Sequence, residues 1–208
     1  MSSASLTPRK APRQARAVAT VEAIAQAATQ LLRENGLAAM TTNAVAARAG
    51  VSIGSLYQYF PNRDALMVEL IRREQRGHVE RVRAALVLCE ELDLEATVRL
   101  LVRAAMGHHR ADALLASAID HEEARLPVDA IIAETLAEGG ALLMHLFSRF
   151  RDEIGPLDPA RAARTLPALV RSVVDAWANL AQSELEVAEE EAVQAVLGYL
   201  CIYRRLAA

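Results

Sequence analysis

The stretch that decides the fold is TTNAVAARAGVSIGSLYQYFPNRDAL, which runs from Thr41 to Leu66. It contains two short apolar-periodic runs separated by a glycine at position 50, with threonines before the first run. A threonine side chain at 41 or 42 satisfies free backbone N–H groups at a helix start, and glycine adopts the positive φ of a tight turn. The stretch therefore predicts helices over 43–49 and 53–59 that cross at the small residue Ala46, a helix-turn-helix.

The second predicted helix carries side chains suited to a DNA-facing surface. Small residues at its start let the backbone approach a phosphate, and hydroxyl groups donate to phosphate oxygens. Gln58 is the candidate for pairing with a base edge, while Leu56 and Phe60 are expected to anchor the helix on its own core. Tyr57 and Tyr59 cannot face the same way on a helix. We expect Tyr57 to point outward, and for Tyr59 both exposure and partial burial stay open.

Charge is distributed unevenly along the chain. Residues 1–73 carry nine Arg and Lys against four Asp and Glu, a balance of +5, and residues 74–208 carry fourteen against twenty-two, a balance of −8. A basic head on an acidic body fits a nucleic-acid-binding segment fused to a non-binding body, since phosphate neutralisation drives such binding. Ordinary charge fluctuation is the alternative explanation.

The motif resembles the DNA-binding domain of the TetR family. The resemblance covers roughly residues 18–78 and is carried by AVAARAGVSIGSLYQYFPNRDAL, preceded by an amphipathic helix that ends at Asn35-Gly36. It implies that the fourth helix begins with a phosphate-contacting residue, here Arg63. Ile53 departs from the family, which usually has a polar or basic residue there, so base contacts at this position are apolar or absent. The candidate DNA-binding residues are Thr42, Asn43, Ser52, Ile53, Gly54, Ser55, Tyr57, Gln58, Tyr59 and Arg63.

Composition predicts an all-α fold. Apolar residues make up 53% of the 208 residues and aromatic residues only 4%, a balance typical of packed helices rather than strands. Periodicity and breaks predict about nine helices in three parts: a flexible basic arm (1–15), a DNA-binding domain with a three-helix helix-turn-helix (16–78), and a larger helical ligand-binding and dimerisation domain (79–208). The glutamates at 184–191, in the last predicted helix, are expected to form a solvated face.

The chain shows no signature of export or membrane insertion. Its two cysteines, Cys89 and Cys201, lie far apart and have no partner motif, which favours a reducing compartment. The N-terminus lacks an apolar signal region, and no run approaches the roughly 18 unbroken apolar residues of a membrane span. We expect a cytoplasmic protein that does not contact a membrane.

The larger domain is expected to dimerise, because one helix-turn-helix reads only half of a palindromic site. The resemblance implies an intersubunit bundle of the last two long helices, although the same apolar rows would also serve a core within one chain. The candidate interface residues are Val170, Val173, Val174, Trp177, Val193, Val196, Leu197 and Leu200. The resemblance also implies a small-molecule effector of unknown identity in the middle helices. Its candidate contacts are Met106, His108, His109, Phe147 and Trp177, although a plain core role is favoured for any single one of them.

A possible metal site is suggested by five residues that lie close together in sequence: His108, His109, His121, Glu122 and Glu123. The segment after His121 lacks the second histidine of an HExxH helix, and adjacent histidines point about 100° apart on a helix. We therefore predict no metal and no cofactor.

No phosphate loop, catalytic carboxylate pair or nucleophile-base motif is recognisable, so we expect no enzyme. The expected function is a ligand-responsive DNA-binding regulator that acts as a repressor. The alternatives are a helical interaction module that does not read DNA and a metal-responsive regulator.

Overall fold

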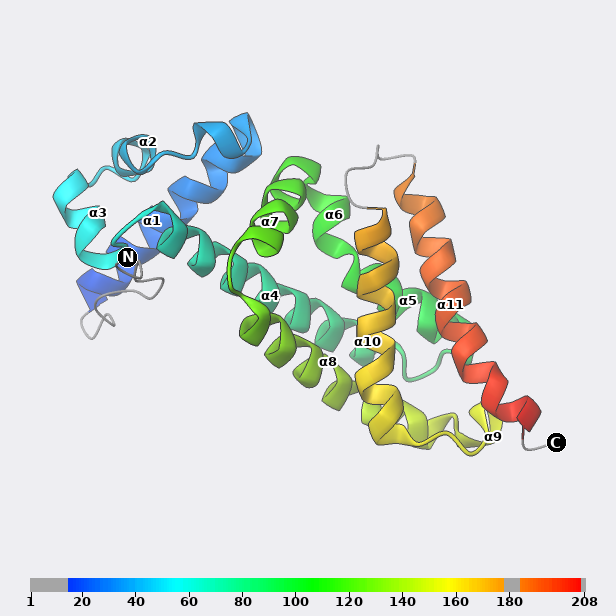
Figure 1. Ribbon diagram of the computed structural model, residues 1–208. Coiled ribbons are helices and arrows are strands. Elements are labelled where there is room, and N and C mark those ends of the chain that lie inside the picture. The colour runs from blue at the N-terminus through cyan, green and yellow to red at the C-terminus, as the bar shows by residue number, and fades with distance from the viewer. Residues whose placement is uncertain (1–14, 178–183, 207–208) are drawn as a thin grey trace. The chain divides into compact units, whose positions relative to one another are not determined.

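The computed structural model describes residues 15–177 and 184–206. Over these residues the chain forms eleven α-helices and one 3₁₀ turn, and no strand (Figure 1). The all-α prediction is confirmed, although the expected number of nine helices was too low. The helices are α1 (Ala15–Asn35), α2 (Thr42–Arg48), α3 (Ile53–Tyr59), α4 (Arg63–Leu88), α5 (Leu94–Ala105), α6 (Gly107–Ala111), α7 (Ala113–Arg125), α8 (Asp129–Arg149), α9 (Arg151–Ile154), α10 (Pro159–Ala176) and α11 (Leu185–Leu206), with the 3₁₀ turn at Leu37–Ala39.

The chain folds into two compact units, and the division does not follow the sequence order. The first unit holds residues 15–74 together with Asp112–Val128, and the second holds Gln75–Ala111 together with residues 129–177 and 184–206. The predicted boundary lies at residue 78, with 112–128 in the larger domain. By its packing, α7 instead belongs with the helix-turn-helix.

The first unit is built on α1 and α7, which contact each other. α1 buries Ile24, Ala28 and Leu32, and α7 buries Ala116 and Ile119. α1 ends at Asn35 as expected, because Gly36 adopts a φ of +70° and its N–H donates to the Leu32 carbonyl at 2.9 Å. Arg33 in the last turn of α1 forms a 3.0 Å ion pair with Asp112, whose carboxylate also caps α7.

The second unit has a core contributed by α5, α8, α10 and α11. α10 lies alongside α11 in Figure 1, and the two helices are in contact. α8 crosses α10 at Gly140, where an added Cβ would lie 2.1 Å from the Ala163 carbonyl oxygen. A glycine is therefore required for this close approach. Asp158 caps α10, and Pro159 follows as its first residue.

Two long helical stretches of the second unit are interrupted. α5 is separated from α6 at Met106-Gly107, where the Arg81 side chain lies so close that a Cβ on Gly107 would be 2.8 Å from its Cδ. α8 stops at Arg149 and is followed by the short α9. Gly155 ends this segment with a φ of +73°.

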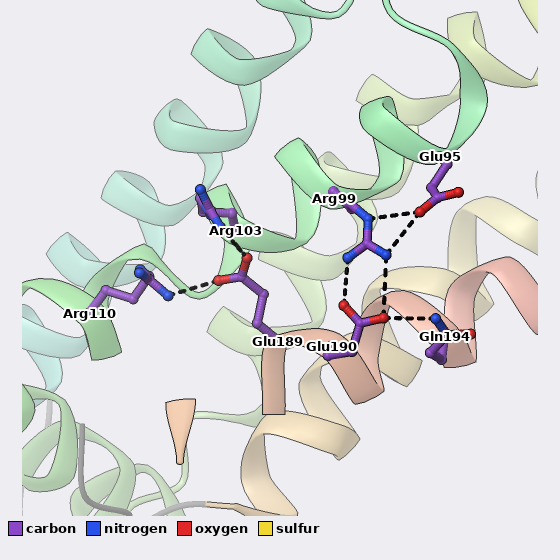
Figure 2. Close-up of polar contacts among 7 residues, drawn as sticks. All are labelled: Glu95, Arg99, Arg103, Arg110, Glu189, Glu190 and Gln194. Carbon is purple, nitrogen blue, oxygen red and sulfur yellow. Dashed lines mark hydrogen bonds and ion pairs between the residues drawn. The ribbon is translucent and has the colours of Figure 1, made fainter. Parts of the chain in front are cut away.

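The acidic run of α11 is only partly buried, because Glu186, Glu190 and Glu191 are exposed and Glu189 is not. Glu189 is buried and forms ion pairs with Arg103 of α5 and Arg110 of α6, each at 2.8 Å. Glu190 pairs with Arg99, which also bonds Glu95 (Figure 2). The expectation of a solvated face fails at Glu189, because helical periodicity does not show that arginines of other helices lie opposite this residue.

Within the described part of the chain, only α8 is long and apolar enough to cross a membrane by length and composition. A core helix of a globular domain meets the same criterion, and α8 packs against α10 through Gly140.

Candidate nucleic-acid interface

Side-chain caps begin both helices of the helix-turn-helix. The Ala44 N–H donates to Thr41 Oγ1 at 3.2 Å, and the Ser55 N–H donates to Ser52 Oγ at 3.0 Å. Each cap satisfies one of the backbone donors left free at a helix start. Thr41 is thus the capping threonine, so α2 begins at Thr42, and α3 spans the predicted residues 53–59.

Between the two caps, Gly50 makes the turn. Its φ is +67°, and the following Val51 N–H donates back to the Ala46 carbonyl at 3.0 Å. Ala46 is buried, as predicted for the helix crossing, and Leu56 and Phe60 are fully buried beside it. These contacts hold one face of α3 on the core and leave its opposite face outward.

The outward face contains most of the predicted DNA-binding residues. Six of them are exposed, with Ile53 at 38%: Asn43, Ser52, Ile53, Gly54, Tyr57 and Gln58. Thr42, Ser55 and Tyr59 are half-buried. Tyr57 is 41% exposed, so it faces outward as predicted, whereas Tyr59 turns partly toward the core. The exposed face therefore combines amide, hydroxyl and apolar groups.

A side-chain contact connects the outward faces of the two helices. Thr42 Oγ1 and Tyr57 Oη lie 3.2 Å apart, within hydrogen-bonding distance. The pair fixes the position of the tyrosine hydroxyl relative to the start of α2. A phosphate at this position would meet two hydroxyl groups and the N-terminus of α2, all of which favour an anion.

The chain's own packing does not require a glycine at position 54. A Cβ built there would have Ser52 Oγ as its nearest neighbour, at 3.8 Å, which is ordinary contact distance. Glycine also lowers helix stability relative to alanine. The absence of a side chain at this exposed position therefore leaves α3 open to close approach by a ligand.

Arg63, the residue predicted to contact a phosphate, forms hydrogen bonds with two other residues of the first unit. Its Nε donates to the Met40 carbonyl at 3.2 Å, and its Nη1 and Nη2 each lie 3.3 Å from Oε1 of Glu122 on α7. Its side chain is 33% exposed, whereas that of Glu122 is 2% exposed. No local sequence pattern predicts this contact, because Arg63 and Glu122 are 59 residues apart.

The Glu122 carboxylate also binds Arg125. Arg125 donates to Oε2 of Glu122, with Nη2 at 2.6 Å, and forms a close ion pair with Asp64 of α4. These bonds raise the pKa of the Arg125 guanidinium, first through Asp64 and then through Glu122. The four side chains Arg63, Asp64, Glu122 and Arg125 form a neutral network that ties the first turn of α4 to α7.

The candidate dimer residues fall into two groups. Val193, Val196 and Leu200 are buried inside the chain's own core, Val193 completely, so the structure leaves them no surface for a partner. The other candidates are half-buried and pack against the edge of this core: Val170, Val173, Val174, Trp177 and Leu197. The apolar row of α11 faces α5 and α10 of the same chain, so the alternative role in a core within one chain applies to Val193, Val196 and Leu200.

The candidate effector residues are likewise divided. Met106 and Phe147 belong to the buried core, and Trp177 packs against it while its Nε1 donates to Glu191 at 2.7 Å. His108 and His109 lie half-buried on α6 with their ring centroids 3.7 Å apart, so the two rings do not diverge as expected. The apolar candidates therefore share one core, while the two histidines form a separate pair on α6.

Comparison with known proteins assigns both parts of the chain. Residues 19–70 match the family model "Bacterial regulatory proteins, tetR family", and residues 93–200 match "Tetracyclin repressor-like, C-terminal domain". The HTH-type transcriptional repressor KstR of Rhodococcus jostii is 31% identical over 183 residues, which cover 84% of this chain and 81% of KstR.

Solved structures share the fold. A TetR-family transcriptional regulator from Mesorhizobium loti has a TM-score of 0.66 at 18% identity, covering 91% of this chain and 98% of that one. FadR from Bacillus subtilis, solved in complex with stearoyl-CoA, has a TM-score of 0.60 at 20% identity, covering 84% of this chain and 98% of that one. Together with the helix-turn-helix and the two family matches, these similarities establish that the chain belongs to the TetR family of bacterial DNA-binding transcriptional regulators.

Proposed function

We propose that this protein is a ligand-responsive repressor that binds a palindromic operator as a dimer and changes its DNA affinity when a small molecule occupies the second unit. The observation that carries the proposal is the capped helix-turn-helix whose outward face displays Tyr57, Gln58 and the open backbone at Gly54. Family membership and the identity to the repressor KstR support repression as the activity. We also propose a cytoplasmic location, because the protein must reach DNA.

In this proposal α3 reads the major groove and the start of α2 contacts the backbone. Gln58 is fully available for a bidentate contact to a base edge, because it lies exposed on the face opposite the buried Leu56. Asn43, Ser52 and Ser55 supply hydrogen bonds to phosphates. Ile53 contributes an exposed apolar group, which suits a thymine methyl better than a hydrogen-bonding base edge.

Dimerisation is proposed to use the half-buried apolar side chains of α10 and α11. Val170, Val173, Val174 and Trp177 lie on α10 or at its end, and Leu197 lies on α11. Covering these groups with a second copy removes apolar surface from water, which is the main favourable term in association. Two heads placed one helical turn apart, roughly 34–36 Å, would match a palindromic site.

The effector is proposed to bind among the helices of the second unit, with Met106, Phe147 and Trp177 as apolar contacts and His108 and His109 as polar ones. Met106 and Phe147 are buried. A ligand that contacts them must therefore rearrange the core, and such a ligand shifts the equilibrium between two conformations. Stearoyl-CoA is the first probe, because FadR from Bacillus subtilis has the same fold and was solved with it.

The test is a gel-shift titration of the full chain against its own upstream DNA and against scrambled DNA of equal length, at several salt concentrations. Tight, salt-sensitive binding that prefers the native fragment is the expected result. Equal weak binding to both fragments would favour an interaction module without sequence-specific DNA binding. The same assay with stearoyl-CoA, stearate or free CoA then shows whether the acyl chain or the nucleotide portion alters the affinity.

A further inference from the structure

The first unit contains a buried carboxylate beside a cation at the edge of the helix-turn-helix. Glu122 is 1% exposed, and its Oε1 lies 3.3 Å from both Nη1 and Nη2 of Arg63. The Nε of Arg63 is bonded to Met40, which directly precedes the Thr41 cap of α2. Arg63 therefore lies beside the helix start where Thr42 and Tyr57 place their hydroxyl groups.

Arg63 still has capacity to bind an anion in this arrangement. A guanidinium has five N–H groups, and the bonds to Met40 and Glu122 use three of them. One third of the side chain is exposed. A DNA phosphate approaching it would be attracted by Arg63 and repelled by the carboxylate on the other side of the same guanidinium.

We propose that Glu122 sets the strength of DNA binding by competing with a phosphate for Arg63, so that α7 carries an electrostatic restraint on the DNA-binding face. This inference rests on the proposed DNA-binding function. It assigns to a buried acidic residue, outside the helix-turn-helix in sequence, a positioning role in DNA affinity.

Arg125 makes the restraint adjustable. It binds the second oxygen of Glu122 and also pairs with Asp64, which neighbours Arg63 on α4. A carboxylate that pairs with two guanidinium groups attracts each of them less strongly than a carboxylate that pairs with only one. Without Arg125, the Glu122 carboxylate pairs only with Arg63, and the restraint becomes stronger. Without the charge of Glu122, the restraint is removed.

The experiment measures the affinity of the full chain for its own upstream DNA as a function of salt for the wild type, E122Q, R63A and the double variant. Glutamine keeps an oxygen that accepts from Arg63 but removes the negative charge. For E122Q, the slope of log K against log salt is expected to steepen by roughly 0.9 for each helix-turn-helix that gains a contact between Arg63 and a DNA phosphate. Affinity at low salt is expected to rise about tenfold, the effect of one charge-assisted hydrogen bond.

Two controls separate this effect from a structural role. Adding R63A to E122Q should abolish the gain, because Glu122 acts through Arg63. E123Q, which changes the adjacent buried carboxylate, should leave the slope unchanged. Circular dichroism and thermal unfolding show whether each variant is folded, and a folded E122Q with the wild-type slope overturns the proposal.

A second variant keeps the proposal testable if E122Q does not fold. R125Q changes a side chain that is 43% exposed and is expected to lower DNA affinity in the wild type but not in the R63A background. An equal loss in both backgrounds contradicts the inference. A wild-type protein that binds neither DNA fragment would instead refute the proposed function. If the wild type binds DNA and the variants bind it with the same affinity and salt dependence, only this inference is refuted.

Discussion

Nη1 of Arg110 on α6 lies 2.8 Å from Oε2 of Glu189 on α11. Arg103 of α5 binds the other oxygen of the same carboxylate, and the neighbouring Glu190 pairs with Arg99 (Figure 2). The N-terminal half of α11 is thereby tied to α5 and α6 by charge as well as by apolar packing. A buried carboxylate requires such partners, because removing it from water without them is unfavourable.

Glu189→Gln is expected to lower the free energy of unfolding by about 1–3 kcal/mol, because two charge-assisted interactions of a buried carboxylate are lost. Arg103 is 62% exposed and regains water, which limits the cost. Urea denaturation followed by circular dichroism measures the change. Glu186→Gln, at an exposed position of the same helix, is the matched control and should change stability by less than about 0.5 kcal/mol. Equal losses in the two variants would contradict the role of Glu189.

Gly140→Ala is expected to destabilise the second unit by about 1–3 kcal/mol or more, because the new Cβ would meet the backbone of Ala163. Neither backbone can move aside without separating α8 from α10. The neighbouring Gly139→Ala has nothing within 4 Å of its Cβ, so it should be neutral or stabilise α8 by about 0.5–1 kcal/mol. Thermal unfolding compares the two variants, and a stable Gly140→Ala protein would show that the helices cross less closely.

Gln58→Ala is expected to change which operator sequence is preferred, by about 1–3 kcal/mol at the base pair it reads. A bidentate amide contact distinguishes bases, whereas a phosphate contact does not. Binding to a library of single-base operator variants measures this preference. Gln30→Ala, at an exposed position of α1, is the control that should leave it unchanged. A uniform loss on all sequences would remove Gln58 from base recognition.

Gly54→Ala is expected to separate folding from DNA binding. The substitution fits the chain and favours helix, so the free energy of unfolding should rise by about 0.5–1 kcal/mol. The added methyl group should keep α3 from approaching DNA closely and reduce affinity about tenfold or more. Urea denaturation and gel-shift titration of the same preparation measure both quantities. Unchanged DNA affinity would show that the backbone at this position does not approach the DNA.

The pairing of Glu190 should persist into acid. The hydrogen bond from Arg99, and then that from Gln194, lowers the pKa of the Glu190 carboxyl from its ordinary 4.5 to about 2. Because the folded pKa is the lower one, the stabilisation is present above pH 4.5 and disappears as the pH falls through about 2. A carboxyl carbon NMR titration gives the midpoint directly. Arg99→Ala should return this midpoint toward 4.5, and an unchanged midpoint would exclude Arg99 as the cause.

The helix-turn-helix could be predicted from sequence because its determinants are local. Capping residues, the glycine at position 50 and the apolar spacing all act within a few residues, so α3 begins and ends where predicted. Local residues also specify the start of α10, because Asp158 caps this helix and Pro159 follows as its first residue. The outward direction of Tyr57 followed from helical periodicity together with the burial of Leu56.

The partners of these elements were decided by tertiary structure. Periodicity identifies the apolar face of α11 but does not say whether another helix of the chain or a second subunit covers it, and Val193 proved to be internal. Arg63 and Glu122 are 59 residues apart, and α7 joins the first unit although its sequence neighbours belong to the second. The sequence by itself determined the local helices and the DNA-binding motif, because short-range bonds specify them. Only the folded chain determined which charged and apolar faces meet, because those contacts depend on how distant segments pack.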